Sequence, residues 1–305
     1  MTVLTQILST PLFQRALVAA LVVGVSAPIV GTYLVQRRLS LLGDGIGHVA
    51  LTGVAMGWLV GSATHAAAAD AYAIPGAMVA AIAGALIIEA VRTGGRLGAD
   101  LALALLFYGG IAGGVVLIGL AGGSNANLVS YLFGSLSTVS RADLIAIIVV
   151  AAVIMVVGLG LRSALFAVST DIEFARSAGL PVALLNVGIA VVAALTVTVA
   201  MRVVGLLLVS ALMIVPVAAS QLLARSFRRT MTLAMAIGAI SCLVGLLITF
   251  YIPLAPGAVI VVVAITIYAG VAAYTAARHH LTPGTSHAAD DSAARRVGRT
   301  ARNHA

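Results

Sequence analysis

The stretch DLIAIIVVAAVIMVVGLGL, residues 143–161, places eighteen uncharged, almost purely aliphatic residues behind one aspartate. A helix needs about 20 mostly apolar residues to cross the hydrocarbon core of a bilayer. Eight further runs have this character, and they cover 13–35, 45–61, 72–91, 101–121, 182–201, 204–224, 231–250 and 257–277. The sequence therefore predicts an all-α polytopic membrane protein with nine transmembrane helices, or eight if the short second run does not span.

The composition excludes several classes of protein. Of 305 residues, 62% are hydrophobic and 9% are charged, whereas soluble domains are nearer 45–50% apolar and 25% charged. All seventeen basic residues are arginine, and without a lysine the chain has no Walker-type phosphate loop. The single cysteine, Cys242, excludes a disulfide within the chain and a thiolate metal cage.

The arginines predict the orientation of the chain. They occur singly or in pairs between apolar runs, as the positive-inside rule produces, and this pattern does not suggest nucleic-acid binding. With nine spans and the N-terminus outside, the twelve arginines before residue 278 divide into nine inside and three outside. The apolar run from Ala16 has no clear cleavage site and is interpreted as a retained first span. We expect a multi-pass protein of the plasma (inner) membrane with a cytoplasmic C-terminus.

The composition changes at residue 278. We expect a transmembrane domain over 1–277 and a disordered tail over 278–305, because the tail has almost no large apolar residues. Four irregularly spaced histidines lie in the tail, which argues against a built metal site, and its arginines suit contact with anionic lipid. These histidines are His279, His280, His287 and His304.

The most informative ionisable residues lie in RRLSLLGDGIGHVALTGVAMG, residues 37–57. Asp44 and His48 are four residues apart, so on a helix they share one face. A carboxylate and an imidazole suit Zn²⁺ or Mn²⁺, and the glycines around them predict close backbone approach or a break in the helix. Two ligands do not complete a coordination shell, which favours two copies that face a shared pathway. The alternative is that the pair merely caps the second span.

Other acidic residues favour structural roles. Glu89 precedes Arg92 by three residues, and this spacing predicts a local ion pair. Two aspartates sit at span starts, where a negative charge complements the helix dipole: Asp100 and Asp143. His65 and Asp70 fall in an external loop without matched partners in the sequence.

A second polar island is STDIEFARSAGLPVALLN, residues 169–186. It predicts a short capped helix between two spans, with Ser169 or Thr170 as the N-cap and two acidic residues in the first turn. Glycine and proline should end it; the residues of the turn and the stop are Asp171, Glu173, Gly179 and Pro181. Such a helix is either a docking element for a cytoplasmic partner or an ordinary interfacial helix.

Six blocks of the chain resemble the membrane permease subunits of ATP-binding-cassette importers for zinc, manganese and iron. They occur in order across residues 13–277, and the tail has no counterpart. The blocks are VQRRLSLLGDGIGHVALTGVAMG (35–57), LALLFYGGIAGGVVLI (103–118), YLFGSLSTVS (131–140), STDIEFARSAGLPV (169–182), VGLLLVSALMIVPVAASQLLA (204–224) and LAPGAVIVVVA (254–264).

The resemblance implies an importer permease that works as a dimer, here most simply a homodimer, with two cytoplasmic ATPase subunits and an extracytoplasmic metal-binding protein. It implies that Asp44 and His48 contact the transported metal and that no cofactor is held. It also implies a short cytoplasmic coupling helix over 171–181 that docks on the ATPase, through the matching residues Asp171, Glu173, Ala175 and Gly179.

Two rival classes are less well supported by the sequence. Ion-coupled secondary transporters often contain inverted repeats, and no convincing internal repeat occurs here. An intramembrane enzyme would need a motif such as H-E-x-x-H or G-x-S-x-G, and the chain has neither. The residues do not distinguish Zn²⁺, Mn²⁺ and Fe²⁺ as the metal carried.

Overall fold

The computed structural model describes residues 11–64, 72–94, 98–121, 131–134, 139–252 and 254–281. Within these residues the regular structure is helical and contains no strand. The helices are α2 (Pro11–Gln36), α3 (Leu42–Ala63), α4 (Ala73–Gly94), α5 (Ala99–Leu120), α7 (Arg141–Gly160), α8 (Arg162–Thr170), α9 (Ile172–Ser177), α10 (Val182–Val204), α11 (Leu206–Leu223), α12 (Phe227–Tyr251) and α13 (Pro256–Leu281).

Nine of the described helices are long and apolar enough to cross a membrane, which confirms the predicted all-α polytopic fold. The short second run, 45–61, is part of the 22-residue helix α3, so it has the length of a full span. The helix break considered for the glycine-rich start of this run does not occur, because α3 is continuous from Leu42. Its glycines serve contacts with neighbouring helices instead.

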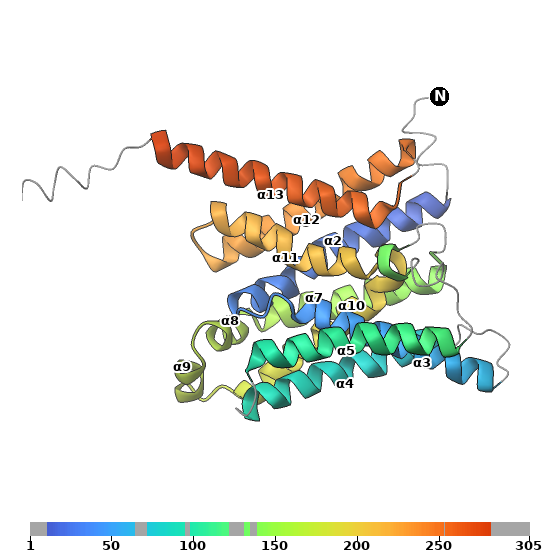
Figure 1. Cartoon of the computed structure of the whole chain (residues 1–305). Coiled ribbons are helices and arrows are strands. Elements are labelled where there is room, and N and C mark those ends of the chain that lie inside the picture. The colour runs from blue at the N-terminus through green and yellow to red at the C-terminus, as the bar shows by residue number, and fades with distance from the viewer. Residues whose placement is uncertain are drawn as a thin grey trace, which may run out of the picture.

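The long helices run side by side along roughly one common direction (Figure 1). Helix α3 packs between α4 and α5, whereas α10 contacts α2, α3, α4, α7 and α11. Helix α13 packs against α11 and α12 at the outer side of the bundle. The best-buried side chains accordingly lie on the central helices, for example Ala193, Val197 and Leu208.

Small residues allow the helices to approach closely. A Cβ atom added to Gly53 of α3 would lie 2.3 Å from the carbonyl oxygen of Gly76 in α4, and one added to Gly76 would lie 2.4 Å from the oxygen of Gly53. Such a separation leaves no room for any side chain. Glycine therefore serves helix packing here, as it commonly does in membrane helices.

The helix ends follow local rules. Asp143 and Ser140 form a reciprocal capping box at the start of α7, which confirms the predicted position of Asp143 at a span start. At the other end of the chain, α13 continues to Leu281, four residues beyond the predicted boundary at 277. The remainder of the predicted tail, 282–305, lies outside the described residues. Helices α8 and α9 lie at the end of the bundle where α2 ends and α10 begins (Figure 1).

Candidate metal pathway and coupling segment

Asp44 and His48 lie one turn apart at the start of α3. Asp44 is in the first turn of the helix, and both side chains are half-buried. Among the described residues, no cluster of three or more His, Cys, Asp or Glu side chains surrounds a metal-sized space. Asp44 and His48 thus lie on one face of α3, and their role as metal ligands stays a prediction.

The imidazole of His48 packs against an aromatic ring of α5. Its ring centroid lies 4.6 Å from that of Phe107, with an interplanar angle of 80°. The Nδ1 atom of His48 is buried and has no hydrogen-bond partner within the described part of the chain. A buried polar atom without a partner costs free energy, which a ligand at this nitrogen would recover.

The glycines around the pair show which side of α3 the pair occupies. Cβ atoms on Gly43 and Gly47 would meet side chains of α11, at 3.3 Å and 2.0 Å, whereas one on Gly45 would meet leucines of α5 at 3.6 Å. At 100° per residue, Asp44 and His48 fall between these two sides of the helix. The pair thus faces the sector between α11 and α5, opposite the side that packs on α4.

Two further residues fix α3 against α5 next to this pair. The hydroxyl of Thr52 donates a 2.7 Å hydrogen bond to the carbonyl oxygen of Gly110. A Cβ atom on Gly110 would lie 2.7 Å from the carbonyl carbon of His48, so the two backbones touch. The small residues of LFYGGIAGG, residues 106–114, predict close packing of this span, and Gly110 confirms it, whereas no signal in the sequence pointed to the contact of Phe107 with His48.

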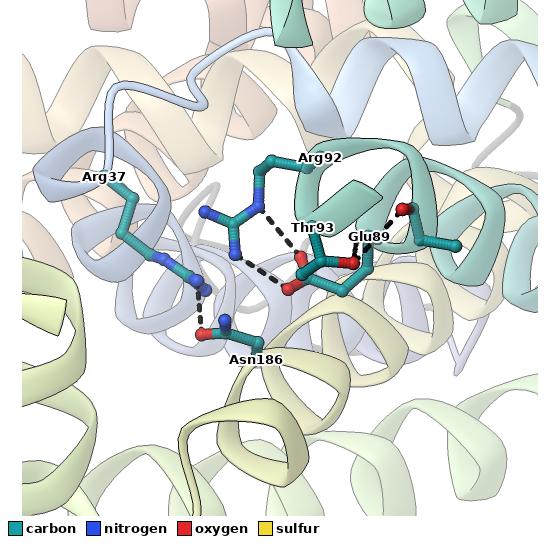
Figure 2. A network of polar contacts seen from close by, with 6 residues as sticks. Arg37, Glu89, Arg92, Thr93 and Asn186 are labelled. Carbon is teal, nitrogen blue, oxygen red and sulfur yellow. Dashed lines mark hydrogen bonds and ion pairs between the residues drawn. The ribbon is translucent and has the colours of Figure 1, made fainter. Parts of the chain in front are cut away.

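A polar network lies at the end of the bundle near the start of α3. The predicted ion pair between Glu89 and Arg92 is confirmed, with Nη2–Oε1 and Nε–Oε2 distances of 2.7 and 3.1 Å. Beside it, Nη2 of Arg37 donates to the side-chain oxygen of Asn186 in α10. Figure 2 shows these residues together with Thr93, whose hydroxyl donates to the Glu89 carbonyl at 2.9 Å. Sequence reasoning did not connect Arg37 with Asn186.

The predicted coupling segment has a different start from the one expected. Ser169 and Thr170 belong to the preceding helix α8, so the prediction that one of them caps the short helix is wrong. The N-cap of α9 is Asp171, whose carboxylate accepts hydrogen bonds from the amides of Glu173 and Phe174, both at 3.0 Å. An extended backbone at Asp171 separates α8 from α9 and turns its side chain onto the helix start.

The end of α9 is as predicted. Gly179 has φ +74°, which glycine adopts without strain. Its amide donates to the carbonyl of Arg176 and the amide of Leu180 donates to that of Ala175, both at 3.0 Å, which is the Schellman arrangement. Pro181 then precedes α10.

The exposed face of α9 suits a protein partner. Glu173 and Arg176 form an exposed ion pair of 2.8 Å, and Phe174 is 64% exposed although it is a large apolar residue. Ala175 is fully buried, so it packs α9 onto the bundle and does not itself face a partner. Beside the segment lies a hollow of about 440 Å³ lined by Gln36, Arg37, Arg38, Arg92 and residues 168–173.

Two other predicted positions have simple outcomes. Asp100 lies in the first turn of α5, as predicted, and its side chain is exposed. His65 and Asp70 lie outside the described residues.

A bundle of membrane-length helices, with an ionisable pair inside one span and a surface helix at one end, has the architecture of a transporter permease. The chain matches the ABC 3 transport family over residues 9–275 and belongs to that family. It is therefore a membrane permease subunit of the ATP-binding-cassette importers for zinc, manganese and iron, as the sequence blocks predict.

Relatives and a solved structure agree with this assignment. The chain is 30% identical over 264 residues to the manganese transport system membrane protein MntC of Halalkalibacterium halodurans, with 87% of each chain covered. It is 31% identical to the chelated iron transport system membrane protein YfeD of Yersinia pestis, over 83% of this chain and 82% of that one. PsaBC from Streptococcus pneumoniae, solved in complex with a Fab, matches with a TM-score of 0.74 at 29% identity, over 88% of this chain and 93% of that chain.

Proposed function

We propose that this permease moves a divalent transition metal, Zn²⁺ or Mn²⁺ and less favourably Fe²⁺, into the cytoplasm. The observation that carries the proposal is the pair of Asp44 and His48 on one face of α3, with the Nδ1 atom of His48 buried and without a partner. Oxygen and nitrogen donors suit these ions. Relatives named for manganese and for iron transport support the same class of cargo.

The pair binds the ion incompletely, and that suits transport. Two donors leave most of the coordination shell to water or to a second copy of the chain. A homodimer would bring two Asp44–His48 pairs to one axis, since the pair faces the sector of α3 that α4 does not cover. Weak, incomplete coordination lets the ion enter and leave.

The energy for transport comes from partner chains in this proposal. Cytoplasmic ATPase subunits dock on the coupling segment. Asp171 caps the start of α9 and Gly179 ends it. Buried Ala175 packs α9 against the bundle, and Glu173 lies on the exposed face of α9. An extracytoplasmic metal-binding protein delivers the ion. The chain spans the plasma (inner) membrane with its C-terminus in the cytoplasm, contacts membrane lipid, and binds neither nucleic acid nor a resident cofactor.

The test compares two aspartates in cells that lack other uptake systems. Asp44→Asn and Asp100→Asn both neutralise a carboxylate in the first turn of neighbouring helices, α3 and α5. We expect Asp44→Asn to abolish accumulation of the metal in metal-poor medium, measured by mass spectrometry, while Asp100→Asn accumulates it like the wild type. Both variants should assemble with the ATPase.

Two results would contradict the proposal. Wild-type uptake by Asp44→Asn would remove the aspartate from the pathway, and equal loss in both variants would indicate a general role of first-turn charge. Uptake that survives ATP depletion would favour an ion-coupled secondary transporter.

A further inference from the structure

The contact between Arg37 and Asn186 joins two parts of the chain that are 149 residues apart. Arg37 directly follows α2, and Asn186 lies in the second turn of α10 with only 3% of its surface exposed. Glu89 and Arg92 of α4 lie beside them (Figure 2). The end of α2, the start of α10 and the end of α4 thus meet at one partly buried polar contact.

Within the described residues, Arg37 forms no ion pair with an acidic side chain. Its guanidinium bonds to the neutral amide of Asn186, while the nearby carboxylate of Glu89 is engaged by Arg92 through two hydrogen bonds. Burial first, and then the charge of Arg92, lower the pKa of Arg37 to about 10 against the opposing effect of Glu89. Arg37 therefore stays charged at neutral pH. Burying a charge costs free energy unless the charge is hydrogen-bonded, so the hydrogen bond to Asn186 stabilises Arg37 in this position.

The backbone on the Arg37 side is rigidly shaped. Arg38 has φ +58°, and its amide donates to the carbonyl of Val35 at 3.0 Å while the amide of Leu39 donates to that of Leu34 at 2.8 Å. This is a Schellman end built with a non-glycine residue at the left-handed position. Buried Leu39 anchors the turn, and α3 begins three residues later. A displacement of Arg37 is therefore passed to the start of α3, where Asp44 lies.

The backbone on the Asn186 side leads directly to the coupling segment. Gly179 ends α9, and α10 starts at Val182 after Pro181. The amide of Leu185 donates to the carbonyl of Pro181 at 3.0 Å, so the helix is regular from its first turn. A rigid-body movement of α9 would therefore carry Asn186 with it.

We propose that Arg37 and Asn186 are positioning residues that link the ATPase-coupling segment to the metal-binding helix α3. The inference rests on the proposed function and adds to it the contact through which movement of α9 and α10 reaches Asp44. When one rigid helix moves, a specific polar contact can transmit the displacement to a second rigid helix. The ion pair of Glu89 and Arg92 lies at the end of α4 beside that contact. Because Arg92 engages the Glu89 carboxylate, Arg37 bonds to Asn186 and not to Glu89.

The test measures how much metal is moved per ATP hydrolysed. The permease, its ATPase and its binding protein are reconstituted in liposomes, with Mn²⁺ and Zn²⁺ as separate probes. Asn186→Leu removes the acceptor while it keeps the number and branching of the heavy atoms, and Asn186→Asp keeps an acceptor oxygen. We expect the leucine variant to hydrolyse ATP while moving at least tenfold less metal per ATP, and the aspartate variant to stay within twofold of the wild type.

A double-variant cycle separates the contact from a general packing role. Arg37→Met alone should lower the amount of metal moved per ATP as much as Asn186→Leu does. The double variant should lower it no further, because both substitutions remove the same contact. Arg37 borders the hollow beside α9, so there is room for a substitution at this position. If Asn186→Leu does not assemble, Arg37→Met serves as the test variant.

The outcomes separate this inference from the proposed function. If wild-type transporter moves metal and the assembled variants keep its metal-to-ATP ratio, the link is refuted while the proposed function stands. Additive losses in the double variant also refute it. If wild-type transporter moves neither Mn²⁺ nor Zn²⁺, the proposed function fails and the inference fails with it.

Discussion

Replacing Gly110 with alanine tests whether α5 positions Asp44 and His48, the proposed metal ligands. The new Cβ atom would lie 2.7 Å from the carbonyl carbon of His48 and 2.8 Å from the amide nitrogen of Val49. Both atoms belong to the backbone of a packed helix, so they do not move aside as the end of a side chain does. Because carbon atoms prefer a separation of about 3.5–4.0 Å, α5 must withdraw from α3 by about 0.8 Å.

That displacement sets the expected loss of stability. Overpacking of this kind costs about 1–3 kcal/mol. The hydrogen bond from Thr52 to Gly110, now 2.7 Å long, would stretch to about 3.5 Å and be lost, which costs about 0.5–1.5 kcal/mol more. Gly109→Ala is the matched control, because its Cβ atom meets nothing within 4 Å. We expect Gly110→Ala to be less stable than this control by about 1.5–4.5 kcal/mol.

The assay combines thermal unfolding of the purified permease with metal uptake by cells. Gly110→Ala should unfold at lower temperature and lose uptake, because withdrawal of α5 moves Phe107 away from His48. Gly109→Ala should keep uptake and be stabilised by about 0.5–1 kcal/mol through its helix propensity. Equal stability and equal uptake in the two variants would refute the close α3–α5 contact and its role.

Three further changes test the structure elsewhere. Gly205→Ala should destabilise by about 2 kcal/mol or more, because φ is +88° and the Cβ atom would lie 2.4 Å from the amide of Gly134; its unfolding temperature should fall well below that of Gly188→Ala, which meets nothing within 4 Å. Gly179→Ala, with φ +74° but open space around the Cβ atom, should lose only about 1–2 kcal/mol of stability. An equal loss of stability in Gly179→Ala and Gly205→Ala would contradict the clash at Gly205. Glu89→Gln should cost about 1.5–3 kcal/mol by leaving its arginine without a charged partner, and a thermal scan that shows no change would argue against the ion pair.

Hydrophobic run length predicted the spans because the thickness of the bilayer fixes the length of a spanning helix. The nine runs correspond to nine described helices. Local chemistry was equally informative where partners are close in sequence, as for Glu89 with Arg92, for the position of Asp143 at the start of α7 and for the glycine end of α9.

Local rules failed where the same residue type serves two purposes. Ser169 and Thr170 are good N-cap residues, but here they complete α8 and leave the cap to Asp171. The glycines at 43, 45 and 47 predicted either close approach of a neighbouring helix or a helix break, and the structure shows the first, with contacts to α5 and α11. A sequence pattern does not say whether a glycine ends a helix or lets another helix approach.

The sequence by itself determined that the chain is a bundle of membrane helices, that Asp44 and His48 share a helix face, and where α9 ends. These features depend on residues within a few turns of one another. Only the tertiary structure decided that Gly110 touches His48 and that Arg37 bonds to Asn186. A span that is apolar on every side has no sequence pattern that identifies which face meets which neighbour. Contacts between distant helices are therefore set by packing of the whole bundle.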